Sequence, residues 1–509
     1  MSTLCAGPCV ANGDAVGLDK VPSLPIEEFR EVVIDHVREG NRVHALFGGK
    51  TEDGGVSLTA VLGDPNRGLL QFLTSSLQAD TYPSLTPECP QVHWFEREIA
   101  EQWGVVPEGH PWLKPIRFHP SYRHGNDAWG RPPQVDILPS VTNFFRVDGE
   151  EVHEVAVGPV HAGVIEPGHF RFQCHGEQVF HLEISLGYQH RGVERALVGG
   201  PNKRTIHYIE TLAGDTSVGH SLAYCQVVEG LANVRVSPRA QALRAIALEM
   251  ERLPSHTGDL GALADDVGYL PTASFCGRLR GDFLNSFGIW CGSRFGRGLI
   301  RPGGVQFDVT KERVDKMLKR MNGALPDVAG AAKLLWNTPS VQARFENTGA
   351  VTPQIAEKLR LVGPAMRACG FDHDVRHDYP SGFYRYVIIP VATCPSGDVF
   401  ARAYVRWMEI QRSMEFINQE LADVPGGEPL IPVGALRPRA MVASLTEGWR
   451  GEICHVAVTD DRGRFAQYKV IDPSFHNWIG LAMALRDQQI SDFPLCNKSF
   501  NLSYCGHDL

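Results

Sequence analysis

The chain has 509 residues, of which 43% are hydrophobic and 21% are charged, and its formal net charge is −9 at pH 7. This length allows two or three domains with substantial cores, and the composition is that of a globular protein rather than a disordered one. The negative charge and the lack of a Lys/Arg-rich stripe argue against nucleic acid as a partner.

The N-terminal residues are rich in Gly, Ala, Pro and Ser and show no apolar period. We therefore expect residues 1–25 to be a flexible leader, and not a signal peptide, since they contain neither a charged start nor an apolar segment. Cys5 and Cys9 could be a ligand pair, but incidental thiols in a mobile tail are the simpler interpretation. The other cysteines are scattered singly, which is typical of a reduced cytoplasmic protein rather than of a disulfide framework.

Residues 26–133 are predicted to form a small α/β domain. The segment 26–40 places Phe29, Val33 and Val37 on one helical face and ends at Gly40. Three strands with Gly and Asp turns between them are expected at 44–50, 56–64 and 68–77. The next helix and turn, HWFEREIAEQWGVVPEGHP (93–111), resemble the signature of the thirty-kilodalton subunit of complex I, a domain that docks other subunits. For its helical carboxylates Glu98 and Glu101 we favour local capping and pairing over proton transfer.

A stretch rich in Pro, Gly and Asn follows at 121–145, and we place the linker between domains at 134–150. The second domain, 151–509, is predicted to be mainly helical with small β-sheets, so the fold class is α+β. Hairpins are expected around 175–177 and 461–463. Helices are expected at 217–234, from Pro238 through residue 253, and at 398–424, which should be the longest. No apolar run approaches the roughly 20 residues of a membrane-spanning helix, so membrane association is expected to come through partner subunits.

The stretch 158–225 is the most informative part of the chain. It contains the motifs GPVHAGVIEPGHFRF (158–172) and GYQHRGVER (187–195), and EGWRGE follows at 447–452. These motifs resemble the large subunit of membrane-bound nickel-iron hydrogenases (group 4, formate hydrogenlyase-type) and the related forty-nine-kilodalton subunit of complex I. A fusion of units similar to these two complex I subunits is typical of formate hydrogenlyase-type large subunits.

The resemblance identifies the positions at which these hydrogenases hold nickel and iron, which are two Cys-x-x-Cys pairs. Here those positions carry Ala213, Thr216, Ser503 and Gly506, and Cys505 lies one residue out of place. Complex I binds a quinone headgroup with a histidine and a tyrosine, and the matching positions here carry Ile165 and Gly214. The chain therefore resembles the energy-converting-hydrogenase-related class that lacks the nickel-iron cysteines. We expect it to bind no metal and no cofactor of its own.

Three residues are our candidates for chemistry. Glu166 matches the glutamate that hydrogenases of this type keep beside the metal as a proton carrier. Set among Val164, Ile165 and Phe170 it would be desolvated, with a raised affinity for protons; capping of the next turn or pairing with Arg171 is the alternative. Asp215 and His220 would flank the vacated cavity, although a hydrogen-bonded core histidine is the favoured interpretation of His220.

Other polar residues have structural interpretations. The family places the turn that contains His190, Arg191 and Glu194 against a small iron-sulfur subunit, and we interpret these residues as scaffold.

The resemblance implies a large hydrophilic subunit of a membrane-bound complex I-like or hydrogenase-related oxidoreductase, which couples electron transfer, with quinone as one allowed acceptor, to ion transport. The expected partners are a small iron-sulfur subunit, similar to the twenty-kilodalton subunit of complex I, that holds the cluster, a ferredoxin-like iron-sulfur subunit and antiporter-like membrane subunits. We expect the assembly at the cytoplasmic face of the inner membrane. Two alternatives stay open: a catalytically silent scaffold or small-molecule-binding subunit that links redox and membrane arms, and a formate hydrogenlyase-type hydrogenase subunit.

Overall fold

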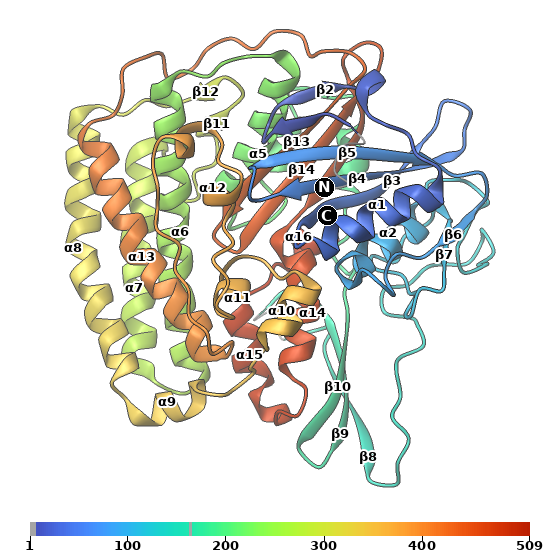
Figure 1. The fold of residues 1–509 in the computed structure, drawn as a ribbon. Helices are drawn as coiled ribbons and strands as arrows, with labels where there is room; N and C mark the ends of the chain where they lie inside the picture. The colour runs from blue at the N-terminus through green and yellow to red at the C-terminus, as the bar shows by residue number, and fades with distance from the viewer. Residues whose placement is uncertain (1–6, 162–164) are drawn as a thin grey trace.

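The computed structural model of the chain describes residues 7–161 and 165–509. Cys5 and Val164, named above, lie outside the described residues. Figure 1 shows long helices side by side in one half of the molecule, sheets of the N-terminal residues in the other, and a three-stranded sheet that projects below. This mixture of long helices and small sheets confirms the α+β class.

The N-terminal part is built on an antiparallel sheet with the strand order β1-β5-β4-β3. Helix α1 contacts this sheet through the buried side chains of Phe29 and Val33, as its apolar spacing predicts, and the Gly40 that follows it has a positive φ of 86°. The elements are α1 (Ile26–Arg38), β3 (Arg42–Lys50), β4 (Val56–Asp64), β5 (Leu69–Ser76), β6 (Thr81–Pro83), α2 (His93–Trp103) and β7 (Val106–Glu108). Strands β6 and β7 form a separate parallel pair.

The flexible leader predicted for residues 1–25 is wrong for much of the described part of that segment. Strand β1 (Cys9–Ala11) pairs with β5, and β2 (Ala15–Gly17) pairs with β13 of the second domain. The side-chain amide of Asn12 also donates to the carbonyls of Tyr379 and Leu445. Tertiary pairing therefore orders a segment whose composition alone favours disorder, and it ties the two main sheets together.

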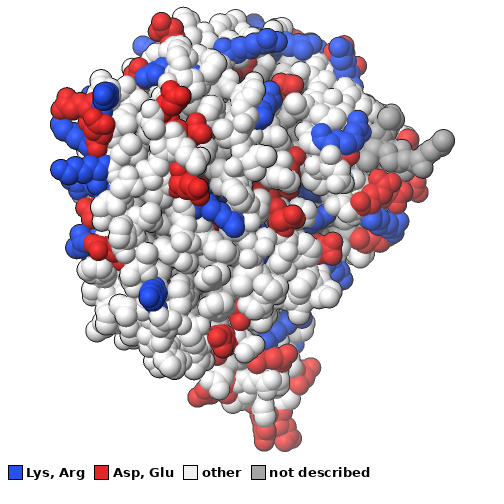
Figure 2. All heavy atoms as spheres, turned by 60° about the vertical axis from the view of Figure 1, so that its left-hand side comes forward, with Lys and Arg blue, Asp and Glu red and all other residues white. Residues whose placement is uncertain are grey.

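The second part contains two larger sheets. Strands β8 (Val152–Val157), β9 (His169–His175) and β10 (Gln178–Ser185) form the projecting sheet, and β13 (Ala440–Gly448), β14 (Gly451–Thr459) and β15 (Phe465–Ile471) continue from β2. The β9–β10 and β14–β15 pairs confirm the two predicted hairpins. A short pair is formed by β11 (Ile300–Arg301) and β12 (Gly304–Val305). In Figure 2, acidic side chains gather on the lower projection, where Glu150, Glu151 and Glu177 are exposed.

The helical half is a bundle of long helices, namely α5 (Ser217–Ala232), α6 (Pro238–Asp266), α7 (Leu270–Cys291), α8 (Lys311–Trp336) and α13 (Val399–Ala422). Helix α6, with 29 residues, is longer than α13, with 24, so the expectation that 398–424 holds the longest helix is wrong. The remaining helices are α3 (Val193–Leu197), α4 (Thr205–Ile209), α9 (Pro339–Phe345), α10 (Pro353–Leu359), α11 (Gly363–Arg367), α12 (Val375–Asp378), α14 (Pro473–Ala484), α15 (Phe493–Phe500) and α16 (Tyr504–Asp508).

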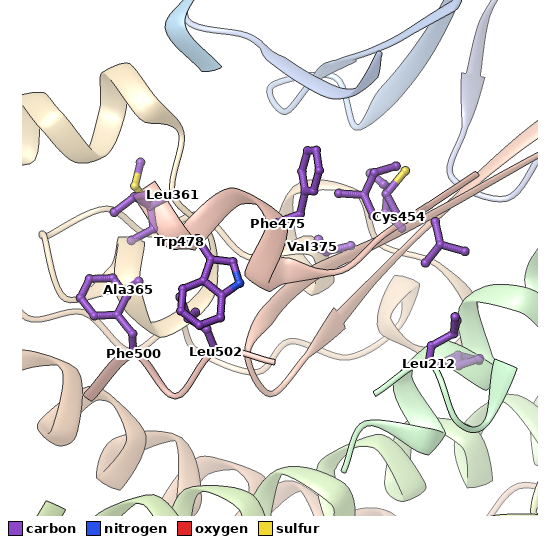
Figure 3. Close-up of a cluster of buried hydrophobic side chains, with 14 of the residues drawn as sticks. Leu212, Leu361, Ala365, Val375, Cys454, Phe475, Trp478, Phe500 and Leu502 are labelled. Atoms are coloured by element: carbon purple, nitrogen blue, oxygen red, sulfur yellow. The ribbon is translucent and has the colours of Figure 1, made fainter. Parts of the chain in front are cut away.

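The two parts share one apolar core and several buried ion pairs. Figure 3 shows part of this core around Phe475 and Trp478, with residues from distant segments such as Leu212, Leu361 and Cys454. Between the parts, the Lys469 ammonium lies 2.6 Å from a Glu98 oxygen, and His44 Nδ1 lies 2.8 Å from Glu452. The structure describes every residue between Glu108 and Val152, and none of them lies in a helix or strand. The linker limits 134–150 stay a prediction.

Candidate functional site

Three segments meet where the candidate residues were predicted: the loop 213–216 before α5, the C-terminal helix α16, and the segment before β9 that contains Glu166. Ser503 caps α16 by accepting a hydrogen bond from the amide of Gly506 at 2.9 Å. Glu166 accepts a hydrogen bond from the amide of Tyr504 at 3.3 Å, and Cys505 contacts both Glu166 and the backbone of Gly214. The fold therefore brings the predicted residues to one place.

Glu166 is half-buried rather than enclosed. Its Oε2 atom contacts the start of α16, while Arg171, the alternative partner, is paired with Glu154. Pairing with Arg171 is therefore not what the structure shows, and Glu166 contacts the first turn of α16. Its role as a proton carrier stays a prediction.

Asp215 forms a bidentate ion pair with Arg450 from the turn between β13 and β14. The two guanidinium nitrogens lie 2.6 and 2.8 Å from the two carboxylate oxygens. Arg450 stacks 3.9 Å from the centroid of the Trp449 ring, and the Trp449 indole donates to the carbonyl of Asp215. A planar guanidinium with a paired carboxylate and an aromatic face is a rigid arrangement. Arg450 also donates to the carbonyl of Asn501, which joins this pair to the C-terminal segment.

His220 lies in a fully buried chain of hydrogen bonds. Its Nε2 is 3.0 Å from Asp472 and its Nδ1 is 3.1 Å from Nε2 of His455, whose Nδ1 is 2.8 Å from the hydroxyl of Tyr468. Burial, with His220 nearby, lowers the pKa of His455 well below its ordinary value, so this imidazole is neutral. The chain is satisfied when Tyr468 donates to His455, His455 to His220, and His220 to Asp472. Both nitrogens of His220 thus have partners, as the favoured interpretation of a core histidine requires.

The carboxylate of Asp472 occupies space that a side chain at position 506 would need. A Cβ atom at Gly506 would lie 2.7 Å from Cγ of Asp472, inside the van der Waals contact distance. Burial alone would raise the pKa of Asp472, but the hydrogen bond from His220 and the charge of Arg450 hold it below its ordinary value. The carboxylate is therefore ionised at neutral pH, and it stands where a cysteine at position 506 would have to place its side chain.

The turn GYQHRGVER contacts the end of the chain. The amides of Gly187 and Gln189 donate to the two oxygens of Asp508, and His190 Nδ1 lies 2.8 Å from the Asp508 carbonyl. Arg191 donates to the carbonyls of Leu212 and other nearby residues, and Glu194 pairs with Lys469. These contacts hold α16 and the loop before α5 in place, which agrees with the interpretation of this turn as scaffold.

Comparison with known proteins separates the chain into two matched parts. Residues 42–132 match the family model of the respiratory-chain NADH dehydrogenase 30 Kd subunit, and residues 266–437 match that of the 49 Kd subunit. Hydrogenase-4 component G of Escherichia coli (strain K12) is 30% identical over 83% of this chain and 75% of its own length. The chain belongs to the family of the respiratory-chain NADH dehydrogenase 49 Kd subunit and its hydrogenase relatives.

Other members of this family are similar over comparable lengths. Formate hydrogenlyase subunit 5 of Escherichia coli (strain K12) is 27% identical over 92% of this chain and 85% of its own length. NADH-quinone oxidoreductase subunit 4 of Thermus thermophilus is 30% identical over 67% of this chain and 90% of its own length. The expected resemblance to both branches, the hydrogenases and complex I, is confirmed.

The residues at the family's metal positions do not fit a nickel-iron centre. Ala213 and Gly506 have no donor atom, and the hydroxyls of Thr216 and Ser503 are neutral at physiological pH. Burial and the neighbouring Glu166 raise the pKa of the Cys505 thiol to about 11, so it is not a thiolate at neutral pH. Within residues 7–161 and 165–509, no group of three or more His, Cys, Asp or Glu side chains is arranged to hold a metal ion.

The positions that the resemblance assigns to quinone binding do not fit that ligand either. Ile165 packs against the apolar core, and Gly214 has no side chain, so neither can hydrogen bond a headgroup as histidine and tyrosine do. Among the described residues, moreover, no helix is both long enough and apolar enough to cross a membrane.

Sequence reasoning missed the buried carboxylate of Glu251, which lies on α6 beside the first turn of α5. It accepts hydrogen bonds from the amides of Val218 at 2.7 Å and Gly219 at 3.2 Å. Burial raises its pKa to about 8, and Asp215 adds to this rise. Its neighbour Glu249 contrasts with it, because Arg376 and Arg252 outweigh the effect of burial and lower the pKa of Glu249 to about 2. The only sequence signal was the pair of acids in the apolar run ALEMERL.

A second feature missed from sequence is a buried charge network between α6, α11, α12, α13 and β13. Glu409 bridges Arg252, Arg367 and His256 at 2.8 to 3.2 Å. Further members of the network are Asp374, Arg376, Glu447 and Glu249. Because a charge left unpaired in this core would be costly, the network fixes how these elements pack.

Proposed function

We propose that this chain is the large hydrophilic subunit of a membrane-bound oxidoreductase complex, related to complex I and to the hydrogenases, that couples electron transfer to ion transport without a nickel-iron site. The observation that supports this most strongly is the presence of both family domains in one chain, together with the replacement of all four metal-binding thiolate positions. The relatives are named as subunits or components, so we propose that this chain also acts within an assembly.

The partners that we propose are a small iron-sulfur subunit similar to the twenty-kilodalton subunit of complex I, a ferredoxin-like iron-sulfur subunit and antiporter-like membrane subunits. The scaffold turn 187–195 and the residues that it holds support docking of the small subunit, because that turn is fixed from behind by Asp508 and partly exposed in front. We place the assembly at the cytoplasmic face of the inner membrane, with this subunit peripheral.

The chemistry that this chain contributes would involve protons rather than metals. Glu166, Asp215, His220 and Asp472 lie around the former metal positions, and each carries a group that can bind or hold a proton. Electrons would be supplied by a cluster in the partner subunit. The charge of that cluster would act electrostatically on the Asp215–Arg450 pair.

Purification of the native assembly from membranes through a tag on this chain tests the proposal. We expect iron-sulfur and membrane subunits to co-purify, with iron but no stoichiometric nickel in the sample, and electron transfer through the assembly to an added acceptor. A monomeric, active chain, or stoichiometric nickel with hydrogen-dependent dye reduction, would contradict it. Stoichiometric nickel with hydrogen-dependent dye reduction would instead support another candidate, a formate hydrogenlyase-type hydrogenase subunit.

A silent scaffold is the second candidate, and Ile165 and Gly214 favour it, since neither retains quinone-binding groups. Asp215→Asn in the native assembly separates it from the first. The redox proposal expects slower turnover with intact assembly, whereas a scaffold expects no change. Asp308→Asn is a matched control, because Asp308 also forms an arginine pair, with Arg239, in a different part of the bundle.

A further inference from the structure

Glu251 lines a small pocket beside the replaced metal positions. The pocket has a volume of about 10 Å³, roughly the space of one water molecule, and it is partly open. We call it the Glu251 pocket; its lining residues are Asp215, Glu251, Pro254, Ser255, Arg280, Leu284, Phe287, Arg294 and Phe295. Arg280 and Arg294 are exposed, so the mouth of the pocket faces solvent, while Glu251 is buried.

The hydrogen bonds of Glu251 set it apart from other buried carboxylates. Within the described residues, the buried acids that pair with no Lys, Arg or His side chain are Glu96, Asp398 and Glu251. Glu96 accepts hydrogen bonds from hydroxyls and amides of residues 84–86, and Asp398 caps α13, so both are fully engaged in local structure. Glu251 accepts two amide hydrogen bonds and borders a pocket that opens to solvent.

The charges that face Glu251 come from every element packed around the pocket. Asp215, from the loop before α5, disfavours a second negative charge. Arg252, on α6 itself, favours the charge, but Glu249 and Glu409 engage its guanidinium. Arg280 of α7 and Arg294 of the following loop lie at the mouth, where water screens them. No counter-ion therefore fixes Glu251 in its ionised form.

We propose that Glu251 is a proton-exchange site, which takes up and releases a proton through the Glu251 pocket beside the Asp215–Arg450 pair. This deepens the proposed function, on which it rests, because a complex that couples electron transfer to ion transport needs groups that exchange protons near its redox end. The carboxyl gains a proton from water in the pocket and loses it to water, and in either form it can accept hydrogen bonds from the amides of Val218 and Gly219. Arg450 pairs with Asp215 at the pocket and also donates a hydrogen bond to the carbonyl of Asn501, so it connects the pocket to the C-terminal segment.

The charge state of Glu251 also affects its hydrogen bonds with the first turn of α5. An ionised carboxylate at the first turn interacts favourably with the amides of Val218 and Gly219, and protonation weakens that interaction. Asp215 and Thr216 directly precede this turn. Proton uptake at Glu251 is therefore coupled to the segment that replaces the first metal-binding pair.

Infrared difference spectroscopy on the purified full-length chain tests this site directly. The wild-type protein should show a protonated carboxyl band that is lost as the pH is raised from 6 to 10 and that shifts on transfer to D₂O, because the pocket admits water. Glu251→Gln should lack this band, Glu251→Asp should retain one with a changed midpoint, and Glu447→Gln should keep it. Glu447 is the control because burial and Asp374 also raise its pKa, but it borders a different pocket.

An unchanged band in Glu251→Gln, or a band that persists without exchange in D₂O, would overturn the proposal. Neither result would affect the co-purification of partner subunits, so failure of this inference and failure of the proposed function are separable. To guard against misfolding of a variant, Ser255→Thr provides a second measurement. It adds one methyl group to a pocket with room for about one water molecule and keeps the hydroxyl and the carboxyl in place. It should slow the D₂O shift at least tenfold; unchanged exchange would also count against the proposal.

Discussion

Replacement of Glu251 by glutamine should change how the stability of this protein depends on pH. Glu251 has an ordinary pKa of 4.5 when exposed and a pKa of about 8 in the fold, where burial disfavours its charge. Between these values the folded chain binds more protons at this position than the unfolded chain, so this group makes stability fall as the pH rises. Glutamine has the shape of the protonated acid and does not titrate.

The magnitude follows from the difference between the two pKa values. Each pH unit of difference corresponds to about 1.4 kcal/mol, so the free energy lost by the wild-type protein between pH 4.5 and 8 is up to about 5 kcal/mol. At pH 5 the variant and the wild type should be about equally stable, because Glu251 is then protonated. At pH 8.5 we expect Glu251→Gln to be the more stable protein, by about 3 to 5 kcal/mol.

Urea unfolding followed by tryptophan fluorescence at several pH values between 5 and 9 measures this difference. Glu249→Gln is a matched control on the same helix. The pKa of Glu249 is lowered to about 2 by Arg376 and Arg252, which outweigh its burial, so its loss should destabilise the protein at every pH in this range. Parallel curves for Glu251→Gln and the wild type across the whole range would refute the reasoning.

Three further predictions concern an ion pair of the site, an ion pair at the interface between the two parts, and the carboxylate of Glu166. Arg450→Met should lower the unfolding free energy by about 1 to 3 kcal/mol, because it removes charge-assisted hydrogen bonds to Asp215, whose partly exposed carboxylate is then screened by water; urea unfolding at pH 7 measures it, and an unchanged midpoint would contradict it. Lys469→Met should cost about 3 kcal/mol and should loosen the contact of the N-terminal part, since Lys469 is paired with Glu98 across the two parts; protease cleavage at 134–150 should then be faster in the variant than in the wild type. Glu166→Gln should abolish coupled turnover in the native assembly while subunit composition stays the same, because the amide keeps the shape and cannot release a proton; unchanged turnover would return Glu166 to a structural role.

The sequence predicted much of the fold because many of its signals are local. Helix α1 follows from the spacing of Phe29 and Val33, and the β9–β10 and β14–β15 hairpins follow from Gly-containing turns between alternating strands. The pairing of β1 and β2 could not be predicted in this way, because β1 pairs with 69–71 and β2 with 440–442, both distant in the chain. Composition then suggested a mobile leader where the tertiary structure provides hydrogen-bonding partners.

Helix α6 shows how a local signal can mislead. Pro254 predicts an end at residue 253, since proline removes one backbone hydrogen bond and crowds the preceding turn. The helix nevertheless continues to Asp266. The hydroxyls of Ser255 and Thr257 donate to the carbonyls of Glu251 and Leu253 at 2.8 and 2.7 Å, and the second half of the helix is buried against α7, α13 and α15. Packing of the helix outweighs the cost of the proline.

The candidate site was predicted in part because a motif position is also a local signal. Motif positions gave Glu166, Asp215 and His220, and the fold brings Glu166 and Asp215 to the same C-terminal segment. Glu251 could not be predicted from the sequence, because its environment depends on the amides of α5 and on the missing counter-ion. Those are properties of helix packing, and the pair of acids in the run ALEMERL does not show which of the two lacks a counter-ion.

The former metal positions are rebuilt as a set of ion pairs and hydrogen bonds rather than left as an empty cavity. Asp472 is 2.7 Å from the place of a Cβ at position 506, leaves no space for a thiolate there, and also caps α14 by accepting from the amide of Ser474 at 2.8 Å. A cysteine restored at 506 would thus displace a buried carboxylate that pairs with His220. Because Ser503 now caps α16 and Asp472 fills the space beside Gly506, restoring a single thiol would not restore a metal site. The same contacts leave carboxyl and imidazole groups side by side, which is why we propose proton transfer, and not metal chemistry, for this site.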